Sequence, residues 1–117
     1  MDIAAKLQIK PGQLLATIAG PGDVPPIEGP DRASNPGDAD AIIAFVRNSE
    51  ELDAVATAAV EAAKTGKLAW IAYPKAGQLG TDLNRDILAR QLANRDIQPV
   101  RQVSIDGTWS ALRFRPA

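Results

Sequence analysis

The sequence predicts an α/β fold in which a mostly parallel sheet ends in an antiparallel β-hairpin. Two short runs, Ala41–Val46 and Leu68–Tyr73, are apolar throughout, which is typical of strands buried on both faces of a parallel sheet. A segment with helical spacing of apolar residues follows each run. Near the C-terminus, Asp106-Gly107 separates two β-rich segments and predicts a tight hairpin. Because strands that alternate with helices give a parallel sheet covered on both faces, we expect a three-layer sandwich.

The first third of the chain predicts one strand and one long loop. Ile3–Ile9 is either a short helix or an extended lead-in that ends at Pro11-Gly12. Gln13–Ala19 is apolar and partly β-branched, which predicts the first strand. In Gly20–Gly37, nine of 18 residues are Gly or Pro, so no regular helix can form. A loop of this length is either functional or mobile, or it marks the place of a lost helix.

Capping signals predict the first helix after Ala41–Val46. Asn48 is suited to cap it, with Glu51 completing a capping-box-like pair. The helix is expected to end at Lys64-Thr65-Gly66, with a cation in the last turn and Gly in the cap. Its apolar face recurs at helical spacing and comprises Leu52, Val55, Ala56, Ala59, Val60 and Ala63.

The second helix is expected to begin soon after Leu68–Tyr73. Thr81 is the predicted cap, and Asp82 would open the helix where the helix dipole favours a negative charge. Asp86 and Arg90 are spaced as an i,i+4 pair. The buried side would comprise Leu83, Ile87, Leu88 and Leu92.

The hairpin is predicted to have a two-residue type I′ turn at Asp106-Gly107, after the strand Val100–Ile105. Such a turn fixes the register so that Arg101 faces Leu112 across the hairpin. On the second strand, one face would carry Trp109, Ala111, Arg113 and Arg115, and the other Leu112 and Phe114.

Composition excludes several kinds of chemistry. The chain has no Cys and no His, so a disulfide, a Cys/His zinc site, a thiol nucleophile and a Ser-His-Asp triad are all ruled out. Residues 1–63 carry four basic and ten acidic side chains, whereas residues 64–117 carry nine and four. The basic half either binds an anion or is neutralised by the acidic half, within the fold or between subunits. The apolar runs are too short to span a bilayer and the N-terminus lacks a signal-peptide core, so we expect a cytoplasmic protein.

Polar side chains suited to bind a ligand gather in the last third of the chain. Lys75 follows a central strand at its carboxyl end, where open α/β sheets place ligands. It either holds a phosphate or carboxylate beside the next helix N-terminus or is an ordinary solvated lysine. Arg101, Arg113 and Arg115 on the hairpin either bind such a group bidentately or pair with acidic neighbours. The candidate ligand-binding residues are Tyr73, Lys75, Asp82, Asn84, Arg85, Arg101 and Arg113.

The order of elements predicts a reduced Rossmann-like domain spanning residues 1–117. The segments AYPK, TDLNRD and VRQVSID followed by TWSALRFRP resemble a family of small, uncharacterised bacterial proteins that carry a domain of unknown function. This resemblance covers about residues 38–116 and implies a fold without an activity.

The element order also resembles the C-terminal half of class I S-adenosylmethionine-dependent methyltransferases, with Gly20-Pro21-Gly22 in place of their Gly-rich turn. In a cofactor-binding Rossmann unit, that turn opens a helix whose N-terminus receives the ligand. Here Val24-Pro25-Pro26 follows the turn and prevents such a helix, so no cofactor is expected.

We therefore expect a non-catalytic cytoplasmic module that binds a protein partner or a small anionic ligand, without nucleic acid, membrane or metal. Asp82 and Asp86 share a helix face, but two carboxylates without a third ligand make a weak cation site. One alternative is a degenerate methyltransferase-like enzyme or cofactor-binding domain that uses the edge from Lys75 to Asp86. The other is a self-associating structural subunit, a homo-oligomer joined through its acidic and basic halves.

Overall fold

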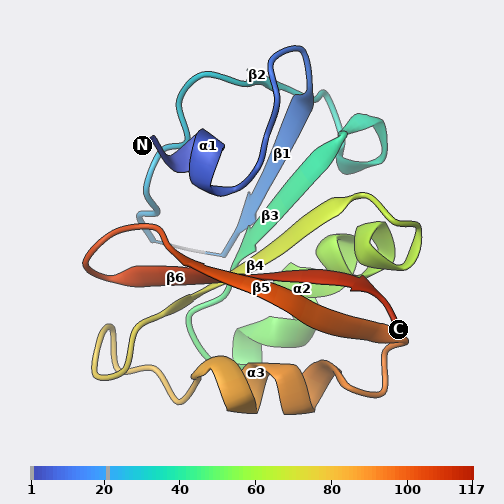
Figure 1. Cartoon of the computed structure of the whole chain (residues 1–117). Coiled ribbons are helices and arrows are strands. Elements are labelled where there is room, and N and C mark those ends of the chain that lie inside the picture. The colour runs from blue at the N-terminus through green and yellow to red at the C-terminus, as the bar shows by residue number, and fades with distance from the viewer. Residues whose placement is uncertain (1, 21) are drawn as a thin grey trace.

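The computed structural model describes residues 2–20 and 22–117, and within them six strands form one sheet in the order β2-β1-β3-β4-β6-β5 (Figure 1). β2, β1, β3 and β4 are parallel, and β6 is antiparallel to both of its neighbours. The predicted mixed α/β fold, with a parallel part and a closing antiparallel hairpin, is confirmed. The strands are β1 (Leu14–Ala19), β2 (Asp31–Arg32), β3 (Ala41–Phe45), β4 (Leu68–Pro74), β5 (Ile97–Ser104) and β6 (Trp109–Pro116).

One face of the sheet is covered by two helices, α2 (Ser49–Lys64) and α3 (Arg85–Leu92). The predicted cap of α2 is confirmed, because the Asn48 side chain accepts a hydrogen bond from the Glu51 backbone N–H at 3.0 Å. The reciprocal half of the capping box is missing, since both Glu51 carboxylate oxygens are buried without a partner among the described residues. All six apolar residues predicted for the buried side of α2 are buried.

The other face is covered by the N-terminal segment and by part of the long loop. The short helix α1 (Ile3–Lys6) lies on this side in Figure 1. Leu7 and Ile27 are almost fully buried against the sheet in the same hydrophobic cluster as Trp70. The Trp70 indole N–H also donates to the Leu7 carbonyl at 2.9 Å, which fastens the end of α1 to β4.

The Gly/Pro-rich segment contains more regular structure than the sequence predicts. Its Asp31–Arg32 pair forms β2, which extends the parallel sheet beside β1, and a single 3₁₀ turn, η1 (Pro36–Asp38), precedes β3. The Arg32 guanidinium also donates to the Ile27 carbonyl at 2.6 Å. Residue 21 lies outside the described residues. Among its described residues, Ile27 packs against the sheet, on the face that a helix covers in a longer α/β protein.

The second helix begins three residues later than predicted. Asn84 caps α3 by accepting a hydrogen bond from the Ile87 backbone N–H at 2.8 Å. Thr81, the predicted cap, instead accepts from the Leu83 N–H at 3.0 Å and forms a local turn before the helix. Either residue type can cap, but Asn is among the strongest capping residues, whereas threonine hydroxyls also stabilise short turns.

The ion pair on α3 is not the predicted one between Asp86 and Arg90. Asp86 lies 3.4 Å from its neighbour Arg85, and within the described part of the chain it forms no ion pair with Arg90. Both side chains are more than half exposed, so the contact contributes little to stability.

The hairpin pairs one residue away from the predicted register near its turn. Arg101 faces Arg113 instead of Leu112, and Ser104 faces Ser110. Because side chains alternate between the two faces of a strand, this shift places Arg101 on the same face as Arg113.

The Asp106 side chain explains the shift. Its Oδ1 accepts hydrogen bonds from the backbone N–H groups of Thr108 and Trp109, each at 2.8 Å. The Ile105 N–H donates to the Trp109 carbonyl at 3.0 Å. The turn therefore takes in an additional residue. The predicted faces of β6 are nevertheless confirmed, because Trp109 and Ala111 pack on the α1 side, whereas Leu112 and Phe114 pack with α2.

Candidate functional site

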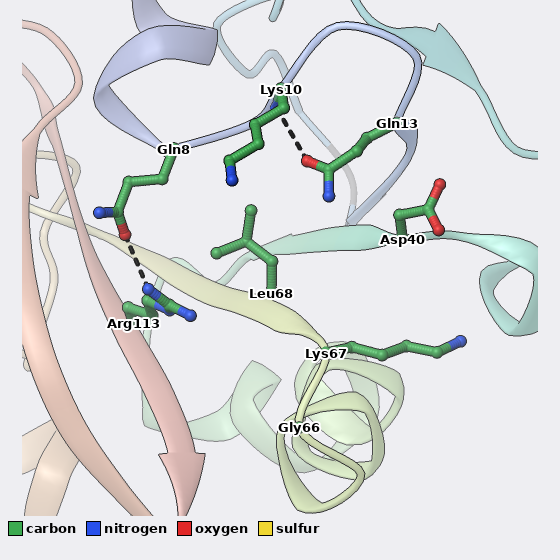
Figure 2. Close-up of a pocket in the computed structure, with 8 residues that line it drawn as sticks. All are labelled: Gln8, Lys10, Gln13, Asp40, Gly66, Lys67, Leu68 and Arg113. Atoms are coloured by element: carbon green, nitrogen blue, oxygen red, sulfur yellow. Dashed lines mark hydrogen bonds between the residues drawn. The ribbon is translucent and has the colours of Figure 1, made fainter.

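A polar pocket of about 460 Å³ lies at the amino ends of β1, β3 and β4. β6 runs antiparallel to β4 and therefore brings its own Arg113 to the same edge. The volume lies within the range of small-ligand sites, about 300–1,000 Å³. The lining residues, all drawn in Figure 2, are Gln8, Lys10, Gln13, Asp40, Gly66, Lys67, Leu68 and Arg113.

The lining carries three cations and one carboxylate, a net charge of +2. The carboxylate, Asp40, is already engaged, because it accepts the Leu14 backbone N–H at 2.9 Å. Lys67 points away from the centre of the pocket in Figure 2 and donates to the Gly37 carbonyl at 3.0 Å. Lys10 and Arg113 therefore supply the positive charge that faces the pocket.

Lys10 and Arg113 approach the same space above Leu68 from opposite sides (Figure 2). The Lys10 ammonium has no hydrogen-bond partner among the residues that the structure describes. The Arg113 guanidinium donates through Nη1 to the Gln8 side-chain oxygen at 2.8 Å. Its Nε is buried and lacks a partner among the same residues. A buried donor without an acceptor is unfavourable. Because solvent does not reach Nε, a ligand in the pocket would contact the terminal nitrogens of Arg113 instead.

The end of α1 places Gln8 beside Arg113. The Gln8 and Ile9 backbone N–H groups donate to the carbonyls of Ala5 and Ala4, both at 3.0 Å, which is the hydrogen-bond pattern of a Schellman helix end. That pattern requires a left-handed residue after the cap, and Gln8 has φ +62°. The chain thus turns sharply away from α1 and directs the Gln8 side chain toward β6.

The turn that leads into β1 places Lys10 and Gln13. The Lys10 backbone N–H donates to the Gln13 side-chain oxygen at 2.8 Å, and the Gln13 N–H returns a hydrogen bond to the Lys10 carbonyl at 3.1 Å. With its oxygen occupied, the Gln13 side chain presents its amide N–H₂ group to the pocket (Figure 2).

Five of the seven predicted site residues lie at the opposite, carboxyl end of β4. There the Lys75 ammonium donates to the Ser104 hydroxyl at 2.7 Å and ties the strand end to the hairpin. The Asp82 carboxylate accepts the Ser49 backbone N–H at 2.9 Å at the N-terminus of α2. Hydrogen bonds from the Ser49 backbone and hydroxyl hold the pKa of Asp82 below its usual value of 3.8.

Tyr73 lies on the helix-covered face at this same end. Its ring is buried and its hydroxyl accepts a hydrogen bond from the Gln102 side-chain amide at 2.8 Å. Burial raises the pKa of Tyr73 above 10.0, and the nearby charge of Arg85 partly opposes that increase. The structure thus brings Tyr73 and Arg85 together, while Asn84 serves as the cap of α3.

The two hairpin arginines of the predicted set are neighbours but differ in environment. Arg113 lies in the pocket, whereas Arg101 is exposed on the edge strand directly opposite it. Arg101 therefore adds positive charge to the same face of the sheet without lining the pocket.

The sequence reading missed Gln8, Lys10 and Gln13. The signal for the last two is the Pro11-Gly12 turn immediately before an apolar strand, which places both flanking side chains at the amino end of that strand. No local sequence pattern connects that turn with β6, because the order of strands in the sheet is what brings the two together.

Across residues 2–20 and 22–117, no three acidic side chains gather in a way that would hold a metal ion. No helix in that part of the chain is long and apolar enough to cross a membrane.

Comparisons with known proteins add no relative. No family model matches the chain, and no similar curated protein or solved structure was found.

Proposed function

We propose that the chain is a non-catalytic, cytoplasmic module that binds a small anionic ligand in the pocket between Lys10 and Arg113. The observation that supports this most is the pair of cations that line the pocket from two sides, the Lys10 ammonium and the Arg113 guanidinium, in a lining with net positive charge. An anion placed between them would accept hydrogen bonds from the terminal nitrogens of Arg113. It would also offset the charge of the Lys10 ammonium, which has no partner in the described chain.

The chemistry of the lining favours binding over catalysis. Its side chains are amides, amines, a guanidinium, one engaged carboxylate and one leucine, without a hydroxyl or thiol to act as a nucleophile. A guanidinium and an ammonium bind carboxylate or phosphate through charge-assisted hydrogen bonds. The Leu68 side chain offers an apolar surface for the carbon skeleton of a small ligand.

We infer further that the scaffold is a reduced Rossmann-like sandwich. The support is the parallel order β2-β1-β3-β4, in which the chain passes from one side of β1 to the other, and the antiparallel strand beside β4. Within the described residues β1 leads into a loop and then β2, without the helix whose N-terminus a dinucleotide or S-adenosylmethionine site uses. A cofactor at that turn is therefore not part of the proposal.

Calorimetric titration of the whole chain with succinate and with inorganic phosphate tests the proposal. We expect binding to at least one, weakened about tenfold or more in Arg113→Gln and in Lys10→Met, because each variant removes a charge-assisted hydrogen bond. Affinity should also fall as salt rises.

Arg115→Gln is the matched control, since Arg115 lies on the same strand and face but outside the pocket. It should bind like the wild type. If all three variants bind as the wild type does, or if the wild type binds neither anion, the pocket is not an anion site.

A further inference from the structure

We propose that Gln8 is a positioning residue for Arg113, and that it orients the guanidinium so that its remaining terminal N–H groups can bind a carboxylate or phosphate group. This inference rests on the proposed anion site and specifies how the ligand is held. Gln8, which has a left-handed backbone conformation at the end of α1, thereby has a role beyond closing that helix.

Gln8 occupies a backbone conformation that favours glycine. Its φ of +62° lies in the left-handed region, where a side chain is disfavoured and where helix ends of this type usually carry Gly. The hydrogen bonds that close α1 use only the backbone of Gln8 and Ile9, so glycine would satisfy them equally well. The helix end therefore explains the conformation but gives no reason for a glutamine.

The side chain of Gln8 supplies that reason. Its Oε1 accepts from Arg113 Nη1 at 2.8 Å, so one of the two terminal nitrogens is fixed by the protein (Figure 2). Glutamine is uncharged, so it orients the guanidinium without neutralising its charge. A carboxylate at this position would neutralise it.

The free edge of Arg113 defines the ligand chemistry. Nε is buried from solvent, so the N–H groups left for a ligand are the two on Nη2 and the second one on Nη1. Two parallel N–H groups match the two oxygens of a carboxylate or phosphate. The Lys10 ammonium, on the other side of the pocket, provides a second positive charge for a ligand with more than one negative group.

The test compares affinity with stability in the full-length chain. Succinate and inorganic phosphate are titrated into the wild type, Gln8→Gly, Gln8→Asn and Arg113→Lys, and the Tm of each protein is measured without ligand. Asn tolerates the left-handed conformation but its side chain is one methylene shorter, so it separates reach from backbone strain. Asp96→Gly is the control, because Asp96 has φ +63° and lies outside the pocket.

We expect Gln8→Gly and Gln8→Asn to weaken anion binding by about three- to tenfold, the effect of losing one hydrogen bond that orients a charged group. The Tm of Gln8→Gly should equal or exceed that of the wild type, because glycine relieves the backbone strain. The Tm of Asp96→Gly should likewise equal or exceed that of the wild type, and this variant should bind the anions as the wild type does. Arg113→Lys should lose about tenfold or more, and adding Gln8→Gly to it should cause no further loss.

The outcomes separate this inference from the function on which it rests. If the wild type binds neither probe, both are wrong. If the wild type binds and the two Gln8 variants bind equally well, the anion site stands and the role of Gln8 is refuted. A parallel loss of Tm and affinity in Gln8→Gly would show a structural role only and would also refute it. Preference for succinate identifies a carboxylate ligand, and preference for phosphate a phosphorylated one.

Discussion

Gly22 lies where the loop after β1 meets Arg47, and its lack of a side chain leaves room for the guanidinium. A Cβ at this position would lie 2.6 Å from Arg47 Nη2, and φ is +110°. The same guanidinium donates to the Asp23 carbonyl at 2.6 Å and lies over the Trp109 ring, 5.5 Å from its centre. Arg47 thus fixes this loop against the sheet, and any side chain on Gly22 would displace it.

We expect Gly22→Ala to be more destabilising than Gly29→Ala. Both glycines have φ +110°, but a Cβ on Gly29 would meet nothing within 4 Å. Gly29→Ala should therefore cost only the backbone strain, about 1 kcal/mol, and Gly22→Ala roughly 1–3 kcal/mol more. Urea unfolding of the two variants measures the difference.

Arg47→Ala provides the control for that comparison. In its background the guanidinium is absent, so the two glycine variants should become nearly equal in stability. If the gap persists without Arg47, the clash is not its cause.

The pH dependence of folding should reveal the role of Asp82. The folded-state pKa of Asp82 lies below 3.8, so near that pH the unfolded chain binds more protons than the folded one. The stabilisation is complete at neutral pH and is lost as the pH falls from above 3.8 through the lowered folded-state pKa. We expect Asp82→Asn to lower the Tm at pH 7, with the wild-type and variant curves converging in acid. Thermal melts followed by circular dichroism across this range measure both effects.

Asp31→Asn is the matched control for Asp82→Asn, since Asp31 is exposed on β2 and its carboxylate has no hydrogen bond within the described residues. Its melting curve should follow that of the wild type at every pH. A constant Tm difference between Asp82→Asn and the wild type down to acid pH would contradict the assignment.

At the scale of elements, the register of the hairpin can be tested by cross-linking, because the chain has no native Cys. Ser104 faces Ser110, whereas the register of a two-residue turn would place Val103 opposite the same residue. We expect Ser104→Cys with Ser110→Cys to oxidise to a disulfide, since opposed residues on one face meet the geometric requirement. Val103→Cys with Ser110→Cys should keep free thiols, because the two side chains point to opposite faces. Mass spectrometry and thiol titration distinguish the pairs, and the reverse result would restore the two-residue turn.

The elements show where sequence patterns are sufficient and where they fail. The apolar runs and the Asn48 cap predicted β3, β4 and α2 within a residue, because burial on both faces and capping are local signals. Before α3, two residue types that both cap helices compete, and the structure uses Asn84, while Leu83 is buried ahead of the helix. The hairpin register depends on two hydrogen bonds of one aspartate, which the Asp-Gly signal alone does not encode.

At the scale of the whole molecule, the candidate site was only partly predictable. Arg113 belonged to the predicted set, but the sequence did not indicate at which end of the parallel strands it lies. The sheet order places β6 next to β4 and antiparallel to it, so Arg113 lies at the amino end beside Lys10. Residues more than 100 positions apart, such as Gln8 and Arg113, meet only through that order.

The edges of the sheet and the surface bear on self-association. β2 has two residues, and β5 is interrupted by a bulge between Pro99 and Arg101 that also returns the far end of the hairpin to the predicted register. Both features discourage the pairing of edge strands between molecules. Within the described residues, only two large apolar side chains are exposed, Leu79 and Val100.

We therefore expect the chain to sediment as a 12.4 kDa monomer at micromolar concentration. The acidic and basic halves already meet inside one molecule, where Arg95 pairs with Asp53 on α2. Charge attraction between molecules is screened over about 10 Å at 0.1 M salt, so without an apolar patch it gives no stable dimer. Sedimentation velocity in about 20 mM and about 500 mM NaCl should give the same mass. A dimer that dissociates at high salt would instead support the self-associating subunit, and Arg95→Ala, which frees Asp53, would then shift its dissociation constant.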